Sequence, residues 1–164
     1  MKSCRVAHRS DYSIRRMADA DIRSVASLLA ALALEHITHE FDARARERFL
    51  AKNDESNIRD FVAQGFRYHV AESHGRIVGF VGVRDNKHLY HLFVANDFQR
   101  QGIARRLWAV AREQCLAAGN SGSFTVNSSN NAIPVYERLG FARSGPARND
   151  DGVLYNPMAT TGQT

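Results

Sequence analysis

The stretch HLFVANDFQRQGIARRLWAVARE, from His91 to Glu113, changes character in its middle. Its first residues, through Ala95, are an apolar run typical of a buried strand. From Gly102 onward, apolar side chains recur at the spacing of an amphipathic helix. The polar turn between the two consists of Gln99, Arg100, Gln101 and Gly102. The sequence therefore predicts a strand joined to a helix by a turn that ends on a glycine.

A helix start of this kind is a candidate phosphate site. The first backbone N–H groups of a helix have no partner inside it, and the helix dipole adds partial positive charge there. Gly102 lets the backbone approach an anion closely, and Ala104 keeps the first turn low. Nearby arginines add charge: Arg100, Arg105 and Arg106. A glycine that only eases the turn is the alternative. The Walker and Rossmann glycine patterns are both absent.

The rest of the chain mixes strands and helices around one sheet. Strands are predicted at 12–16, 66–73, 76–85, 87–95, 123–128 and 152–159, and helices at 19–36, 42–50, 56–63, 102–118 and 131–140. Asp19 or Asp21 is available to cap the first helix. Gly79 and Gly82 predict a bulge or a close backbone approach inside their strand. The fold class is α/β (α+β), with a single mixed, mostly antiparallel sheet flanked by helices.

Composition limits the class of protein. With 164 residues, 44% hydrophobic and 24% charged, the chain predicts one domain over residues 1–164, with a core at 12–158 and flexible ends at 1–11 and 159–164. A net charge of +5 favours an acidic partner, either an anionic cofactor or nucleic acid. Two cysteines, Cys4 and Cys115, cannot form a disulfide scaffold. No apolar run predicts a membrane span or signal peptide, so a cytoplasmic setting without a membrane partner is expected.

Two motifs resemble one family. QRQGIA, at 99–104, matches the Gln/Arg-x-x-Gly-x-Gly/Ala signature of the GCN5-related N-acetyltransferases, and it lies between a strand and an amphipathic helix as in that family. Downstream, VNSSNNAIPVYERLGF at 126–141 resembles the family's next strand and helix. The matching positions are Asn131, Ala132, Tyr136, Gly140 and Phe141. The resemblance covers about residues 12–158 and is most specific over 88–141.

The resemblance implies a cofactor and the residues that bind it. In the family, amides of the turn hold the pyrophosphate of acetyl-coenzyme A, and the pantetheine lies along the edge of the preceding strand. No metal is implied. Asn127, at a strand end, is a further candidate for a cofactor or water hydrogen bond, and helix capping is the alternative for it and for Asn131. The cofactor-binding candidates are Leu92, Phe93, Val94, Gln99, Arg100, Gln101, Gly102, Ile103, Ala104, Asn127 and Asn131.

The family's reaction is direct attack of an amine on the thioester in a ternary complex. It requires a proton for the departing thiolate, and Tyr136 is the candidate general acid, with plain aromatic packing as the alternative. Histidine is the side chain best suited to deprotonate the amine near neutral pH. His88 falls where some relatives that acetylate histones carry a glutamate base, and His91 directly precedes the LFV segment. Strand alternation puts the two on opposite faces unless a bulge intervenes. We favour His88, with Tyr90 as its neighbour on the same face, against a surface or hydrogen-bonded histidine.

A polar segment, EHITHE at 35–40, gathers His36, His39 and Glu40. The order differs from the His-Glu-x-x-His of zinc proteases, so no metal site is predicted, and a polar helix face is the simplest reading. In the resembled family this region walls the acceptor pocket.

The sequence thus predicts an acetyl-coenzyme A-dependent N-acetyltransferase. Its acceptor is a small-molecule, peptide or RNA-linked amine, and a homodimer is a candidate assembly. The alternative is a non-catalytic acyl-coenzyme A-binding or nucleic-acid-associated module on the same fold. Arginines gathered around the acceptor cleft would favour nucleic acid, which is not the favoured partner.

Overall fold

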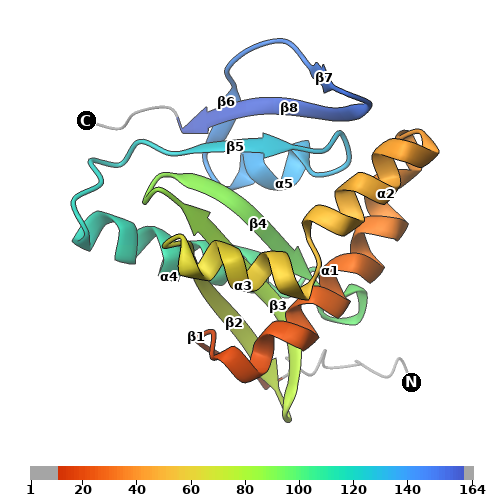
Figure 1. The fold of residues 1–164 in the computed structure, drawn as a ribbon. Coiled ribbons are helices and arrows are strands. Elements are labelled where there is room, and N and C mark those ends of the chain that lie inside the picture. Colours follow the sequence, from red (N-terminus) through yellow and green to blue (C-terminus); the bar gives the residue numbers. More distant parts are fainter. Residues whose placement is uncertain (1–10, 161–164) are drawn as a thin grey trace, which may run out of the picture.

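The structure is a computed structural model that describes residues 11–160. Its elements are β1 (Ser13–Arg16), η1 (Asp19–Asp21), α1 (Ile22–His36), η2 (Thr38–Glu40), α2 (Ala43–Lys52), α3 (Glu55–Ala63), β2 (Arg67–Ser73), β3 (Arg76–Arg84), β4 (His88–Val94), η3 (Asn96–Phe98), α4 (Ile103–Ala117), β5 (Thr125–Ser128), α5 (Ile133–Arg138), β6 (Phe141–Arg143), β7 (Arg148–Asp150) and β8 (Val153–Thr160). Figure 1 shows this arrangement.

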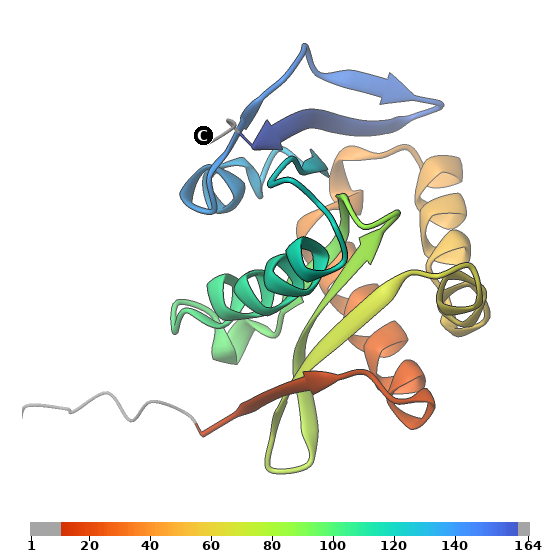
Figure 2. The ribbon, with the colours of Figure 1, turned by 90° about the vertical axis from the view of Figure 1, so that its left-hand side faces the viewer.

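One sheet runs through the molecule. Its strand order is β1-β2-β3-β4-β5-β8-β6, with β7 paired to β8. All neighbours are antiparallel except β4 and β5, which are parallel. Helices α1, α2 and α3 lie on one side of the sheet and α4 on the other, as the two views show (Figures 1 and 2). The predicted fold class, a mixed and mostly antiparallel sheet flanked by helices, is confirmed.

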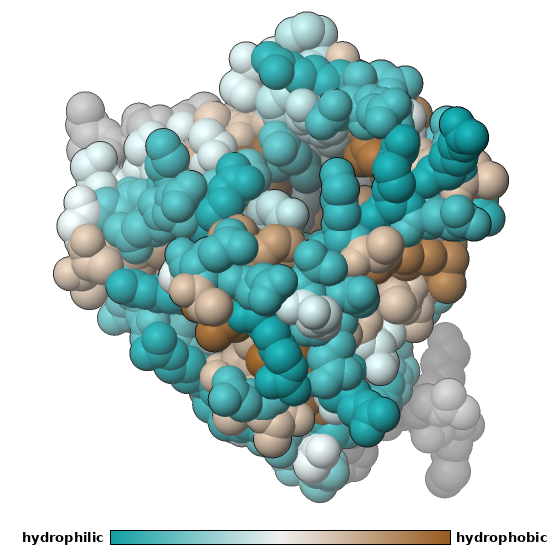
Figure 3. Space-filling view, viewed as in Figure 1, coloured by the Kyte–Doolittle hydropathy of each residue, from teal (hydrophilic) through white to brown (hydrophobic). Residues whose placement is uncertain are grey.

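Two buried clusters fill the two sides of the sheet. On the α4 side, side chains of the helix pack against inward-facing residues of the sheet. The helix contributes Ile103, Leu107 and Trp108, and the sheet contributes Val81 and Leu89 among others. On the α1 and α3 side, a second cluster includes Val25, Leu29, Ile58, Tyr68 and Phe80. The surface on the α3 side is mostly hydrophilic, with small apolar patches (Figure 3). No helix within residues 11–160 is long and apolar enough to cross a membrane.

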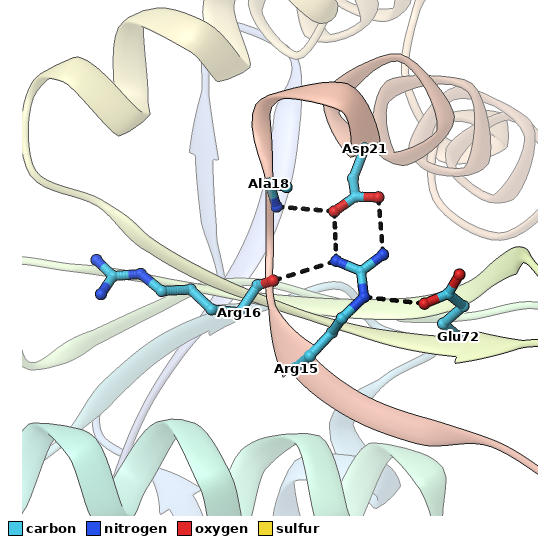
Figure 4. A network of polar contacts seen from close by, with 5 residues as sticks. All are labelled: Arg15, Arg16, Ala18, Asp21 and Glu72. Atoms are coloured by element: carbon cyan, nitrogen blue, oxygen red, sulfur yellow. Dashed lines mark hydrogen bonds and ion pairs between the residues drawn. The ribbon is translucent and has the colours of Figure 1, made fainter.

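An arginine fork joins the first strand to the start of the first helix. The Arg15 guanidinium donates to both carboxylate oxygens of Asp21, at 2.7 and 3.0 Å, and to Glu72 on β2 at 2.9 Å. Figure 4 shows Arg15 between the two carboxylates. Arg15 holds the pKa of Asp21 below its usual value. Asp21, one of the two residues available to cap the helix, lies at the N-cap position of α1, but its side chain accepts from the Ala18 N–H and makes no cap bond to α1.

A bulge interrupts the pairing of β3 with β4. Gly82 pairs with His91 and Val83 with Leu89, which leaves Tyr90 as the extra residue of β4. A side chain on Gly82 would come within 2.3 Å of the Tyr68 ring, and one on Gly79 within 3.0 Å of the Phe93 carbonyl oxygen. The prediction of a bulge or a close approach at these glycines is confirmed, and both occur.

The sequence patterns do not predict several of the short elements. Strands β6 and β7 and the three 3-10 turns were not predicted. Ala159 and Thr160, assigned to a flexible end, are the last residues of β8 and pair with β6. The other expected flexible residues, except Asp11, lie outside the described part of the chain, as does Cys4. Cys115 is buried, as expected.

Candidate functional site

The two parallel strands separate after a short contact. β4 and β5 pair only through His88 with Thr125 and Leu89 with Val126. β4 continues to Val94, paired with β3 alone. From Tyr90 to Val94, the edge of β4 that faces away from β3 therefore has no strand partner among the described residues, and this open edge forms one wall of a split in the sheet.

The open edge of β4 presents two backbone amides. The Ala95 N–H donates to the Val78 carbonyl at 2.8 Å, toward β3. Successive N–H groups of a strand point to opposite edges. The N–H of Phe93 therefore points toward β3, whereas those of Leu92 and Val94 point into the split. Of the three residues predicted at this strand, Leu92 and Val94 can offer an amide to a ligand in the split.

The polar turn between β4 and α4 has an unusual backbone. Arg100 and Gly102 are both left-handed, with φ of 62° and 80°. Gly102 is the residue before α4, and no atom lies within 4 Å of the place where its side chain would start. The Gln99 side chain donates to the Val94 carbonyl at 3.0 Å, which ties the turn to the strand end. The first amides of α4 therefore open onto space beside the split, a geometry suited to an anion.

Asn127 and Asn131 lie on the other wall of the split. Asn127 belongs to β5, and Asn131 precedes α5; both side chains are exposed. Residue 132 is the N-cap of α5 and makes no side-chain cap bond, so neither asparagine caps this helix. Within residues 11–160, neither side chain has a hydrogen-bond partner. Both amides are therefore free to meet a ligand.

Tyr136 is buried on the α4 side of the sheet. Its ring packs edge-on against Phe141, with centroids 5.9 Å apart, in the same cluster as Val94 and Ile103. Burial raises the pKa of Tyr136 well above its ordinary value, so the phenol keeps its proton. Its hydroxyl has no hydrogen-bond partner among the described residues. Tyr136 is therefore both a packing residue and a protonated phenol near the residues that open into the split.

The bulge changes the geometry of the two candidate bases. The rings of His88 and Tyr90 lie 6.4 Å apart, and those of Tyr90 and His91 lie 4.6 Å apart. His91 also contacts Phe80 and Phe93, on the α1 and α3 side of the sheet. A bulge does intervene, as the expectation allowed, so His88 and His91 face the same side of the sheet. The extra residue at Tyr90 resets the alternation, which is the exception that a bulge provides.

His91 is held on both sides by buried polar groups. Its Nε2 lies 2.8 Å from the Asn53 Oδ1, and its Nδ1 lies 3.0 Å from the Tyr68 hydroxyl. Asn53 donates its Nδ2 to the Phe49 carbonyl at 2.8 Å, which turns Oδ1 toward the histidine. His91 must therefore donate from Nε2 and accept the Tyr68 proton at Nδ1. Burial lowers the pKa of His91 to about 3. With both nitrogens engaged, His91 is poorly placed to receive a proton from a substrate.

His88 keeps one ring nitrogen unengaged. Its Nδ1 lies 2.7 Å from the Thr125 hydroxyl, across the paired end of β4 and β5. Within the described chain its Nε2 has no partner. Burial, followed by the charge of Arg84, lowers the pKa of His88 to about 4, so the ring is neutral near pH 7. Of the two histidines, His88 has the geometry of a base.

Sequence reasoning missed the residues that hold these histidines. Tyr68, Asn53 and Thr125 come from β2, the end of α2 and β5, and no local pattern marks them as partners. In the EHITHE segment, His36 bonds to Asn96 and Glu40 to Asn130. Among residues 11–160, no group of three or more His, Cys, Asp and Glu side chains could hold a metal ion.

Comparison with known proteins places this geometry in one family. Residues 31–161 match the acetyltransferase (GNAT) domain, which is more than half of the chain. Human N-acetyltransferase 8 is 33% identical over 95 residues, which are 50% of this chain and only 41% of that protein.

Solved structures share the fold. A GCN5-related N-acetyltransferase of Rhodopseudomonas palustris superposes with a TM-score of 0.75 at 20% identity, covering 92% of this chain and 96% of the other. The PaiA N-acetyltransferase of Thermoplasma acidophilum, solved in complex with coenzyme A, has a TM-score of 0.74 at 14% identity, with 92% and 98% coverage. With the domain match and the split sheet, these likenesses lead to one conclusion: the chain belongs to the GNAT acetyltransferase family.

Proposed function

We propose that the protein is an acetyl-coenzyme A-dependent N-acetyltransferase, a single catalytic domain that transfers the acetyl group to a primary amine by direct attack in a ternary complex. One observation carries the proposal. An open strand edge with two outward amides, at Leu92 and Val94, adjoins a helix start opened by the left-handed Gly102. A long ligand with an anionic middle and a polar arm fits this pair of features. The coenzyme A bound to the PaiA relative and the name of the human relative support the same reading.

Residues on three elements would hold the cofactor. The amides of 102–104 and the arginines beside them would receive the pyrophosphate. The N–H groups of Leu92 and Val94 would donate hydrogen bonds to the pantetheine arm and to the thioester oxygen, and such donors stabilise an oxyanion. Asn127 and Asn131 would complete the opposite wall. Acetyl-coenzyme A itself supplies the activated acetyl group.

The cofactor and the acceptor amine would approach the split from opposite faces of the sheet. The helix start at Gly102 belongs to α4, so the cofactor would reach the split from the α4 side. His88 and Tyr90 belong to the opposite, α1 and α3, side. The acceptor amine would therefore approach from that side, where Nε2 of His88 can receive a proton.

Two side chains, His88 and Tyr136, would account for the two proton transfers of the reaction. The amine nitrogen attacks the thioester carbon, the carbon–sulfur bond breaks, and the acetyl group remains on nitrogen. His88 takes the proton that the amine loses, and Tyr136 gives its phenolic proton to the thiolate. His91, fixed between Asn53 and Tyr68, would hold β4 in shape instead of exchanging a proton.

The nucleic-acid alternative has weaker support. Arg105, Arg112 and Arg138 line a groove of about 560 Å³ between α4 and α5. This groove lies on the cofactor side of the sheet, away from the side assigned to the acceptor. Arginines gathered around the acceptor cleft would favour an RNA-bound acceptor. The arginines of this groove do not lie on the side assigned to the acceptor.

Two measurements test the proposed function. Calorimetry with coenzyme A and acetyl-coenzyme A should show binding of one molecule per chain. A panel of small amines, lysine peptides and charged tRNAs, assayed by release of free thiol, should then reveal an acceptor. Absence of coenzyme A binding would overturn the proposal. Binding without thiol release for any amine would instead support the non-catalytic module.

A further inference from the structure

The segment 35–40, which comprises the end of α1 and the turn η2, bridges the ends of both separated strands. Two asparagines make the connection. Asn96 lies two residues after β4, and Asn130 lies two residues after β5. The segment therefore spans the mouth of the split from one wall to the other.

The two asparagines use their amides in the same way. Asn96 donates Nδ2 to Glu35 at 2.7 Å, and Asn130 donates Nδ2 to Glu40 at 3.0 Å. Each thus holds one carboxylate of the segment, in a charge-assisted bond of the stronger kind.

Their carbonyl oxygens contact residues beside the proposed cofactor site. Asn96 Oδ1 accepts from the Gln99 side chain at 3.2 Å, and also lies 2.9 Å from Nε2 of His36. Gln99 in turn holds the carbonyl of Val94, on the open edge of β4. The polar turn, Asn96 and the segment are therefore linked by consecutive hydrogen bonds.

The second wall repeats this pattern. Asn130 Oδ1 accepts from Asn156 at 2.7 Å. Asn156 is 1% exposed, donates also to the Ser128 carbonyl at 3.2 Å, and accepts from Arg143 at 3.1 Å. This buried amide fixes the chain around Asn130, next to the proposed cofactor residue Asn131.

Among the described residues, the side-chain hydrogen bonds from the segment to the two walls run through Asn96 and Asn130. Thr38 at its centre is fully buried, yet its hydroxyl has no partner in the described chain. A buried hydroxyl without a partner is unfavourable. Burial of Thr38 holds the segment by packing, and the hydrogen bonds to Asn96 and Asn130 are its polar link to the two walls.

We propose that Asn96 and Asn130 are positioning residues that couple the 35–40 segment to the cofactor site, so that binding of coenzyme A orders the segment across the mouth of the split. The proposal rests on the proposed function, because it takes the turn and the wall residues as the cofactor site. Coupling of this kind is reciprocal: the factor by which coenzyme A favours the ordered segment equals the factor by which ordering of the segment raises coenzyme A affinity.

The hydrogen bond between Asn130 and Glu40 can be broken and then rebuilt with its direction reversed. Asn130→Asp places a carboxylate against Glu40 while it still accepts from Asn156. The swap Asn130→Asp with Glu40→Gln restores one donor and one acceptor, and it keeps the net charge of the wild type. Glu47 is an exposed carboxylate of α2. Glu47→Gln is therefore the control for the negative charge that Glu40→Gln removes in the swap.

Calorimetry with coenzyme A and hydrogen exchange of the 35–40 amides test the proposal. We expect Asn130→Asp to weaken coenzyme A binding at least fivefold and the swap to return it to within twofold of wild type, with Glu47→Gln unchanged. Coenzyme A should slow exchange of the segment in the wild type and the swap, but not in Asn130→Asp. A swap as weak as Asn130→Asp would instead indicate plain charge repulsion of the cofactor, and would overturn the coupling.

Failure of the proposal and of the function can be told apart. If coenzyme A binds the wild type yet leaves exchange of 35–40 unchanged, the coupling is wrong and the proposed function stands. If coenzyme A does not bind the wild type, both are wrong. The wild-type exchange experiment needs no variant, and Glu40→Ala removes the tether without repulsion should Asn130→Asp fail to fold.

Discussion

Tyr136 is the residue whose proposed role depends on a single proton. Tyr136→Phe keeps the ring against Phe141 and removes the hydroxyl. We expect single-turnover acetyl transfer to fall by about a hundredfold, the usual scale for one general acid, with coenzyme A affinity little changed. A tyrosine that only packs would lose at most about 1 kcal/mol of stability and no rate. Equal rates for the two proteins, measured beside thermal melts, would leave water as the proton source.

Gly102 is the residue on which the anion site depends. Its φ of 80° is strained for any residue with a side chain, and a side chain there would enter the open space beside the turn. Gly102→Val should abolish coenzyme A binding in calorimetry while circular dichroism stays native-like. Gly119→Val is the matched control, because Gly119 lies at the other end of α4 with a φ of 100° and equally open space. Loss of binding in both variants would point to backbone strain in α4, and retained binding in Gly102→Val would remove the turn from the site.

His88 tests the choice between the two histidines. His88→Ala should lower the acetyl-transfer rate near pH 7 by about a hundredfold, and the rate should recover partly at higher pH, where more of the acceptor amine is already neutral. Exposed His74, in the turn between β2 and β3, supplies the control variant His74→Asn, which should keep the full rate. The recovery is the decisive feature of a pH–rate profile, since a merely misfolded variant would not regain activity with pH. A flat loss at every pH would assign His88 to packing.

At the scale of elements, the β3–β4 bulge shapes the site. It brings His88, Tyr90 and His91 to one face and depends on the room that Gly82 leaves for the Tyr68 ring. Gly82→Ala would put a methyl group 2.3 Å from that ring. We expect a loss of about 1–3 kcal/mol in the free energy of unfolding, the usual cost of overpacking, measured by denaturant titration. Gly145→Ala, where nothing lies within 4 Å, should change stability little; a neutral Gly82→Ala would mean that Tyr68 can move aside.

At the scale of the whole molecule, buried histidines make folding depend on pH. Burial lowers the pKa of His69, His88 and His91, to about 4 for His88 and about 3 for His91. The unfolded chain takes up protons below pH 6.5 while these folded side chains do not. Their contribution to stability is therefore complete above pH 6.5 and is lost as the pH falls toward 4 and below.

Melting temperatures between pH 7 and 4.5 measure this effect. Between pH 6.5 and their folded pKa values, His88 and His91 should each remove up to about 1.4 kcal/mol per pH unit from the free energy of unfolding. His91→Gln removes one titrating group and should make the slope shallower. A melting temperature that stays constant from pH 6.5 to 5 would show that the folded histidines bind protons as readily as the unfolded ones.

The sequence by itself determined the longer helices and strands and the two family motifs. Local patterns sufficed for α4, for the hairpin of β2 and β3, and for the glycine turn, because helix periodicity, strand alternation and glycine backbone freedom act over a few neighbouring residues. For the same reason Gly82 pointed to a bulge. The candidates at 99–104 needed no distant contact to be found.

Only the tertiary structure decided which of these residues face each other. The bulge placed His88 and His91 on one side of the sheet. The two partners of His91 are distant in the chain: Asn53 is 38 residues away and Tyr68 is 23 residues away. Strands β6 and β7 are three residues each, too short for periodicity to register, and they form because β8 offers them an edge. The split itself exists because β4 and β5 pair over two residues and then diverge. The register of the strands, the divergence of β4 from β5 and the burial of side chains depend on contacts between distant segments. Local patterns in the sequence do not reveal these contacts.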